Sequence, residues 1–179
     1  MPSSRRRVVT GHDAQGKSVI ISDAKFGPGD PNVMNPAAEP DFCLSEIWRI
    51  SENPHVDDED VVAGRPIVFA PPKGGVTVKL CELPAEHKRN HAGRAKRFAA
   101  LGTDHGFDES SNRHPAMHKT ESVDIIVVIS GGMKLIMDEG EVLLGPSDIV
   151  VQRGTNHAWS NPFEEPCVFA AILRDATPR

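Results

Sequence analysis

The chain has 179 residues, of which 39% are hydrophobic and 25% charged, and its formal net charge is −5. This composition excludes a disordered or membrane-embedded chain, and the acidic balance argues against nucleic acid as a partner, because phosphate binding needs a basic surface. The length favours a single domain. Since no apolar run approaches membrane-spanning length and no apolar leader is visible at the N-terminus, we expect a cytoplasmic protein.

The first half of the chain alternates between short strand signals and loops rich in proline and glycine. We expect residues 1–17 to be a polar terminus, frayed or docked at an edge, and residues 26–42 to be loop. Strands are expected at 18–21, 43–50, 65–70 and 75–83. In the last of these, Val76, Val78 and Leu80 alternate with Thr77 and Lys79, which is typical of a half-buried strand.

Residues 85–101 form a locally basic stretch with a weak apolar stripe. The pattern favours a solvated helix or loop lying across the fold, and a site for an anionic ligand is the alternative. The three cysteines lie far apart within or beside apolar runs, which indicates buried free thiols. They are Cys43, Cys81 and Cys167.

The second half carries the densest strand signals, each bounded by glycine, proline, serine or aspartate. Strands are expected at 123–130, 133–137, 141–144, 148–152 and 167–174. The last of these is almost wholly apolar and should therefore be central in its sheet.

A polar face precedes the first of these strands. His118, Thr120, Ser122 and Asp124 occupy even positions of one extended segment, so their side chains should point to one side. His157 lies in a Gly-Thr-Asn turn on the far side of two hairpins. Antiparallel pairing could fold His157 back over that polar face.

These residues resemble the two motifs of the cupin superfamily. At positions of the first cupin motif, G-x5-H-x-H-x3-4-E-x6-G, this chain has His118, Thr120, Asp124 and Gly131, and residues 154–161 match the end of the second motif, G-x2-H-x3-N. The resemblance implies an all-β cupin-type double-stranded β-helix (a jelly-roll barrel), with an N-terminal β extension and little helix. Residues 113–174 would form the barrel core, and residues 1–112 would extend the barrel or a dimer interface.

Two departures from the motifs bear on a metal. Thr120 stands where cupins have their second histidine, and Asp124 stands where they have glutamate. In metal-bearing cupins three histidines and one glutamate hold a divalent ion. The resemblance therefore implies iron, manganese, zinc or nickel at His118, Asp124 and His157, while the missing imidazole leaves the presence of a metal open. Hydrogen-bonded structural histidines are the alternative.

We predict a small-molecule site in which His118, His157 and Asp124 are catalytic. The substrate would be bound by Thr120 and Trp159 and by two further residues, Arg113 and His114. The resemblance makes a lyase, isomerase or decarboxylase acting on a small organic acid or cyclic metabolite plausible. A non-haem iron dioxygenase and a non-catalytic ligand-binding or sensor barrel are the alternatives. We expect a homodimer that binds neither nucleic acid nor membrane.

Overall fold

The computed structural model describes residues 2, 4–92, 106–108 and 110–177. Within these residues the chain is β-structure and loop, and helix is confined to one 3-10 turn, η1, at Glu86–Lys88. This confirms the predicted all-β fold class. The strands are β1 (Arg5–His12), β2 (Ser18–Phe26), β3 (Val33–Met34), β4 (Cys43–Ile50), β5 (Val76–Leu83), β6 (Ser122–Ser130), β7 (Met133–Met137), β8 (Glu141–Leu144), β9 (Ile149–Arg153), β10 (His157–Ser160) and β11 (Cys167–Asp175).

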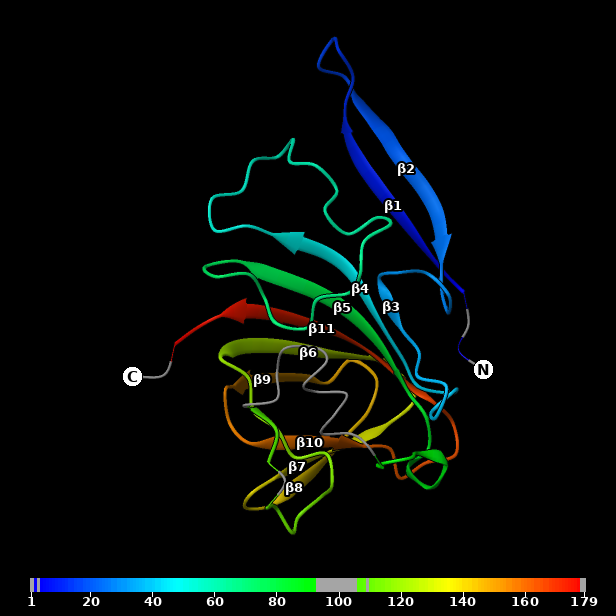
Figure 1. The fold of residues 1–179 in the computed structure, drawn as a ribbon, viewed down its shortest axis with the longest axis vertical. Coiled ribbons are helices and arrows are strands. Elements are labelled where there is room, and N and C mark those ends of the chain that lie inside the picture. Colours follow the sequence, from blue (N-terminus) through cyan, green and yellow to red (C-terminus); the bar gives the residue numbers. More distant parts are fainter. Residues whose placement is uncertain (1, 3, 93–105, 109, 178–179) are drawn as a thin grey trace.

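The strands form two facing sheets and a separate hairpin. One sheet has six strands in the order β3-β4-β5-β11-β6-β9, and the other has three in the order β10-β7-β8. All pairings are antiparallel. As predicted, β11 is central, because it lies between β5 and β6. The β1–β2 hairpin projects away from both sheets (Figure 1).

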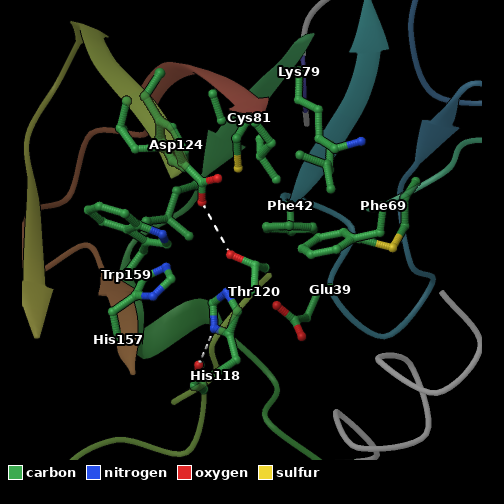
Figure 2. A pocket seen from close by; sticks show the side chains of 18 of the residues that line it. Glu39, Phe42, Phe69, Lys79, Cys81, His118, Thr120, Asp124, His157 and Trp159 are labelled. Carbon is green, nitrogen blue, oxygen red and sulfur yellow. Dashed lines mark hydrogen bonds between the residues drawn. The ribbon is translucent and has the colours of Figure 1, made fainter. Parts of the chain in front are cut away.

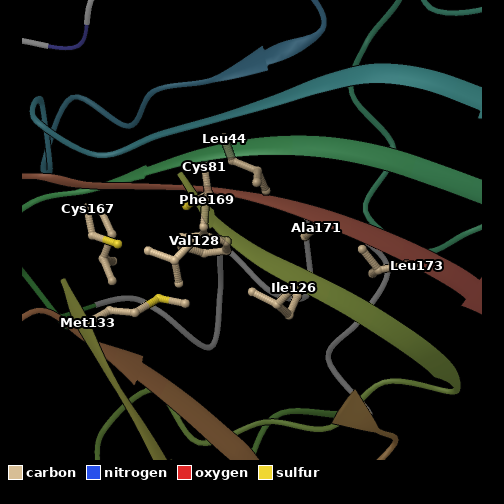
Figure 3. Packing of buried hydrophobic residues seen from close by; sticks show 10 residues of the cluster. Leu44, Cys81, Ile126, Val128, Met133, Cys167, Phe169, Ala171 and Leu173 are labelled. Atoms are coloured by element: carbon tan, nitrogen blue, oxygen red, sulfur yellow. The ribbon is translucent and has the colours of Figure 1, made fainter. Parts of the chain in front are cut away.

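The apolar core lies between the two sheets. Alternate residues of β5, β6 and β11 are buried, and Met133 of β7 contributes from the facing sheet (Figure 3). The core comprises Leu44, Cys81, Leu83, Ile126, Val128, Met133, Cys167, Phe169, Ala171 and Leu173. All three cysteines are buried free thiols, as the sequence predicts.

The buried side of β5 is not its more apolar side. Thr77 and Lys79 point inward with exposures of 0% and 2%, whereas Val76, Val78 and Leu80 are half-buried. The interior satisfies the polar groups, because the carboxylate of Glu46 accepts a hydrogen bond from the Thr77 hydroxyl at 3.1 Å and the Lys79 ammonium donates to the carbonyl of Val68. The alternation in the sequence predicted the strand correctly but did not show which of its two faces is buried.

Three predictions for the first half were wrong, and the first of them concerns the expected loop at 26–42, which contains strand β3. The polar terminus contains strand β1, which pairs with β2 along its length and is anchored by an ion pair of 2.6 Å between Arg5 Nη2 and Glu82 Oε2. Residues 65–70 are not a strand. Their amides bond outside any ladder, since Ile67 N–H donates to the carbonyl of Pro31 and Val68 N–H to the Glu46 carboxylate.

Most of the basic stretch at 85–101 lies outside the described residues, apart from η1 and the few residues after it. The described part of the chain has no helix that is long and apolar enough to cross a membrane.

Candidate functional site

A cavity of about 150 Å³ lies between the sheets, beside the core. Its apolar lining consists of Met34, Phe42, Leu44, Phe69, Leu83, Ala116, Ile126, Trp159, Phe169, Ala171 and Leu173. Its polar lining consists of Glu39, Lys79, Cys81, Arg89, His118, Thr120, Asp124 and His157. In Figure 2 the histidines, Thr120 and Asp124 gather on one side of the cavity, and Phe42 and Phe69 lie on the other.

Two histidines meet at this cavity from distant parts of the chain. The backbones of His118 and His157 hydrogen-bond to each other in both directions, at 2.9 and 2.8 Å. This bridge joins the segment before β6 to the start of β10, and it places the imidazole centroids 4.4 Å apart. The predicted convergence of the two residues is therefore present in the fold.

Hydrogen bonding fixes which ring nitrogen of each imidazole carries the proton. His118 Nδ1 lies 2.9 Å from the carbonyl oxygen of Ala116, and His157 Nδ1 lies 2.9 Å from that of Thr155. A carbonyl oxygen can only accept, so both Nδ1 atoms are donors, and in a neutral ring with this arrangement Nε2 is the basic nitrogen. Burial lowers the pKa of His157 to about 4, against the opposing effect of the Thr155 bond, so this ring is neutral at neutral pH.

Asp124 is held on the same side of the cavity by a chain of hydroxyl groups. Ser122 Oγ donates to Thr120 Oγ1 at 2.8 Å, and Thr120 Oγ1 donates to Asp124 Oδ2 at 3.4 Å. Asp124 is 4% exposed, and its other oxygen, Oδ1, has no hydrogen-bond partner among the described residues. Burial raises the pKa of Asp124 to about 6, against the opposing effects of the Ser122 and Thr120 hydroxyls.

Five of the seven predicted site residues line the cavity, and two do not. The five are His118, Thr120, Asp124, His157 and Trp159. Arg113 is absent from the described lining and donates instead to the carbonyls of Met137 and Gly140, each at 3.1 Å. His114 is also absent from the described lining and hydrogen-bonds to the amide of Ala116 and to Glu86.

The expected metal set of His118, Asp124 and His157 is not gathered as three converging ligands. The described group whose ligand atoms lie within 4.8 Å of one another is Glu86, His91 and His114, which by its spacing could hold a metal ion. Because aspartate is one methylene shorter than the glutamate of the cupin motif, the carboxylate of Asp124 stays with the Thr120 hydroxyl.

The proton positions favour the cavity histidines over the Glu86 group as metal ligands. His114 Nδ1 accepts the amide N–H of Ala116 at 3.1 Å, so its proton sits on Nε2, which donates to Glu86 Oε1 at 3.1 Å. A metal at that Nε2 would require the proton on Nδ1, where the amide already points. His118 and His157 already have the arrangement usual for metal-bound histidine, with Nδ1–H on a carbonyl and Nε2 basic.

Glu39 and Arg89 also line the cavity, although neither was predicted from the sequence to be a site residue. Both are almost fully buried and pair through Arg89 Nε and Glu39 Oε2 at 3.4 Å. Arg89 Nη1 also lies 3.9 Å from Glu86 Oε2, and its guanidinium stacks 5.5 Å from the Phe42 ring centroid. Arg89 belongs to the basic stretch that was weighed as an anion site, but its charge is matched within the protein. No sequence signal marked Glu39, which lies in a proline-rich loop.

Comparison with known proteins identifies the domain. Residues 105–173 match the Cupin_2 family model, described as a cupin domain. The cupin-domain-containing oxidoreductase fogC of Aspergillus ruber is 46% identical over 156 residues, 87% of this chain and 63% of that protein. The corresponding protein virC of Hypocrea virens is 28% identical over 163 residues, 89% of this chain and 70% of that protein.

Other matches are shorter or more distant. The phomopsin biosynthesis cluster protein C' of Diaporthe leptostromiformis is 52% identical over 46 residues, which span 25% of this chain and 24% of that relative. A solved Cupin 2 conserved barrel domain protein from Salinispora arenicola is 17% identical with a TM-score of 0.41, over 81% of this chain and 82% of that one.

Two facing antiparallel sheets enclose a cavity to which two histidines contribute. With the match of residues 105–173 to the cupin domain model, the chain carries a cupin domain.

Proposed function

We propose that this protein is an oxidoreductase that transforms a small molecule inside the cavity between its sheets. The observation that carries the proposal is the histidine pair: the imidazoles of His118 and His157 lie 4.4 Å apart, and the Nδ1 atom of each donates to a backbone carbonyl. The names of the relatives fogC and virC support redox chemistry over the lyase or isomerase activity that the cupin motifs alone suggested.

The residues present fit a divalent metal ion at His118 and His157, as tested by the hydrogen bonds that orient both rings. Imidazole suits iron, copper, nickel and zinc, and a metal ion held there would supply Lewis-acid or redox chemistry to the substrate. The carboxylate of Asp124 does not complete a three-residue set in this arrangement. We therefore expect weaker metal retention than in cupins with three histidines and one glutamate.

The remaining cavity residues have roles that follow from their positions. Asp124 would hold or release a proton at Oδ1, the oxygen that lacks a partner among the described residues. Thr120 keeps the other carboxylate oxygen in place. Trp159 packs between His157 and Phe169, at 5.3 and 5.9 Å between centroids, so it forms a flat wall beside the reacting end and limits access of water.

A second candidate is proton-transfer catalysis without a metal, as in an isomerase or lyase. One observation favours it: Asp124 is buried with a pKa raised to about 6, close to the pH at which a general acid or base works best. Both candidates use the same cavity and differ in whether the histidines carry a metal ion.

Metal analysis of the protein, purified without an affinity tag, tests the proposal. We expect iron, manganese, zinc or nickel in the wild-type protein, retained in His114→Gln and lost in His157→Gln. The two substitutions are matched, because each removes one imidazole from the neighbourhood of His118. His114 lies a few residues before it in the sequence, and the backbone of His157 hydrogen-bonds to its backbone. Metal that is lost in His114→Gln and kept in His157→Gln would assign the ion to the Glu86 group. A metal-free wild-type protein would favour proton transfer.

A further inference from the structure

The cavity has the size of one six-membered ring. Its volume is about 150 Å³, and an engineered apolar cavity of about 150 Å³ is large enough to bind benzene. A fused two-ring molecule would exceed this space unless the walls moved.

The walls suit a flat apolar ring. Four aromatic side chains line the cavity, and they come from both halves of the chain: Phe42, Phe69, Trp159 and Phe169. Trp159 and Phe169 form one surface, with centroids 5.9 Å apart and planes tilted by 41°. Aromatic pairs favour offset or edge-to-face contacts at such distances, so a ligand ring could add to this cluster without disturbing it.

The charges of the described lining residues are matched within the protein. Arg89 pairs with the carboxylates of Glu39 and Glu86. The Lys79 ammonium donates to the carbonyl of Val68, lies 3.4 Å from the Thr77 hydroxyl and is attracted by the carboxylate of Glu46. Each cation thus has an acidic partner within the protein, and the carboxyl group of Asp124 would repel a ligand carboxylate. An isolated charge is costly to bury, so an anionic ligand is disfavoured.

Among the buried polar atoms of the described lining, one lacks a hydrogen-bond partner. Asp124 Oδ1 is buried and has no hydrogen-bond partner among the described residues, and the carboxyl group faces the cavity (Figure 2). A buried polar atom in this position is normally paired, and a ligand hydroxyl or carbonyl would provide the partner. A carboxylate would accept from a hydroxyl, and a carboxylic acid would donate to a carbonyl.

We propose that the ligand of this cavity is an uncharged single-ring aromatic compound whose hydroxyl or carbonyl group bonds to Asp124 Oδ1. The inference rests on the proposed function for the identity of the reacting site. It narrows the expected substrates, small organic acids or cyclic metabolites, to neutral cyclic ones.

Tryptophan fluorescence provides the test, because the chain has two tryptophans and no tyrosine. Trp159 lines the cavity and Trp48 does not, so a Trp48→Phe protein reports from the cavity alone. We titrate it with phenol, toluene, benzoate and 1-naphthol at pH 8, where the Asp124 carboxylate accepts from a hydroxyl, and with benzaldehyde at pH 5, where the carboxylic acid donates to a carbonyl. Phenol and benzaldehyde should bind saturably, and toluene, benzoate and 1-naphthol at least tenfold more weakly than phenol. Benzoate or 1-naphthol binding as well as phenol, or no saturable binding of phenol and benzaldehyde, would overturn the proposal.

Matched variants locate the binding. Ala171→Leu fills the cavity, and Ala170→Leu places the same side chain on the opposite face of β11, so only the first should abolish phenol binding. In Asp124→Leu the preference for phenol over toluene should disappear. Equal loss in both alanine variants, or an unchanged preference in Asp124→Leu, would contradict the assignment. These titrations measure binding without turnover. A metal-free wild-type protein would therefore refute the redox proposal but not the proposed ligand class. Absence of phenol binding would refute the ligand class but not the redox proposal.

Discussion

The buried carboxyl group of Asp124 should make the stability of the protein fall as the pH rises from about 4 to about 6. Burial raises the pKa of Asp124 from 3.8 to about 6. Between these values the unfolded chain releases this proton while the folded protein keeps it, so unfolding is favoured as the pH rises. At about 1.36 kcal/mol per pKa unit, the ionised group destabilises the fold by about 3 kcal/mol above pH 6.

The substitution Asp124→Asn removes this titration and nearly preserves the volume of the side chain. We measure the free energy of unfolding by urea denaturation from pH 4 to pH 8, in EDTA, since a bound cation would itself lower the pKa of Asp124. The variant's stability relative to wild type should increase by about 3 kcal/mol between pH 4 and pH 6 and stay constant above. The comparison is made at each pH because His157, with its lowered pKa, destabilises the wild type and the variant alike as the pH falls.

Glu121→Gln is the matched control, because it removes a carboxyl group three residues away whose side chain is exposed. A pH-independent difference between wild type and Asp124→Asn would refute the reasoning. So would a difference of equal size in Glu121→Gln, since bulk charge rather than burial would then explain it.

The paired charges and the outer sheet surface lead to two further predictions. Arg89→Met leaves the carboxylates of Glu39 and Glu86 without their buried partner and should destabilise the protein by about 3–5 kcal/mol in urea denaturation; a loss below about 1 kcal/mol would contradict the pairing. We also propose a homodimer formed by exposed apolar residues of β2 and β9. Ile20→Lys and Ile149→Lys, at positions each 64% exposed, should shift a dimeric species to monomer in light scattering; a monomeric wild type would refute the dimer.

The second half of the fold could be predicted from the sequence because its signals are local. Strands β6 to β9 and β11 are short β-branched runs separated by turn residues, and their bounds match the expected ranges within one position. Strand β10 was not expected, because His157 was placed in a turn. The meeting of His118 with His157 followed from two sequence motifs. No local pattern states that the backbones of these residues pair, so the resemblance supplied that information.

The first half was harder because tertiary contacts decide its structure. β1 begins with three arginines, a sequence typical of a solvated tail, yet the pairing of Arg5 with Glu82 across the fold stabilises it. Lys79 can face the interior because the Glu46 carboxylate attracts its ammonium group and the Val68 carbonyl accepts a hydrogen bond from it. Glu39 reaches the cavity from a loop whose composition signals only turns. In each case the deciding partner lies far away along the chain.

The two departures from the cupin motif act together at the site. Replacing an imidazole by the Thr120 hydroxyl removes a ligand and adds a donor that holds the shorter carboxylate of Asp124 away from the histidines. The carboxyl group then lies in an apolar setting without a cation, and its pKa rises to about 6. A metal ion at His118 and His157 would lower this pKa, and by linkage ionised Asp124 would strengthen metal binding. Under the proposed function, the two substitutions would therefore replace a tightly held ion by a proton-carrying group whose ionisation is coupled to metal binding at the histidines.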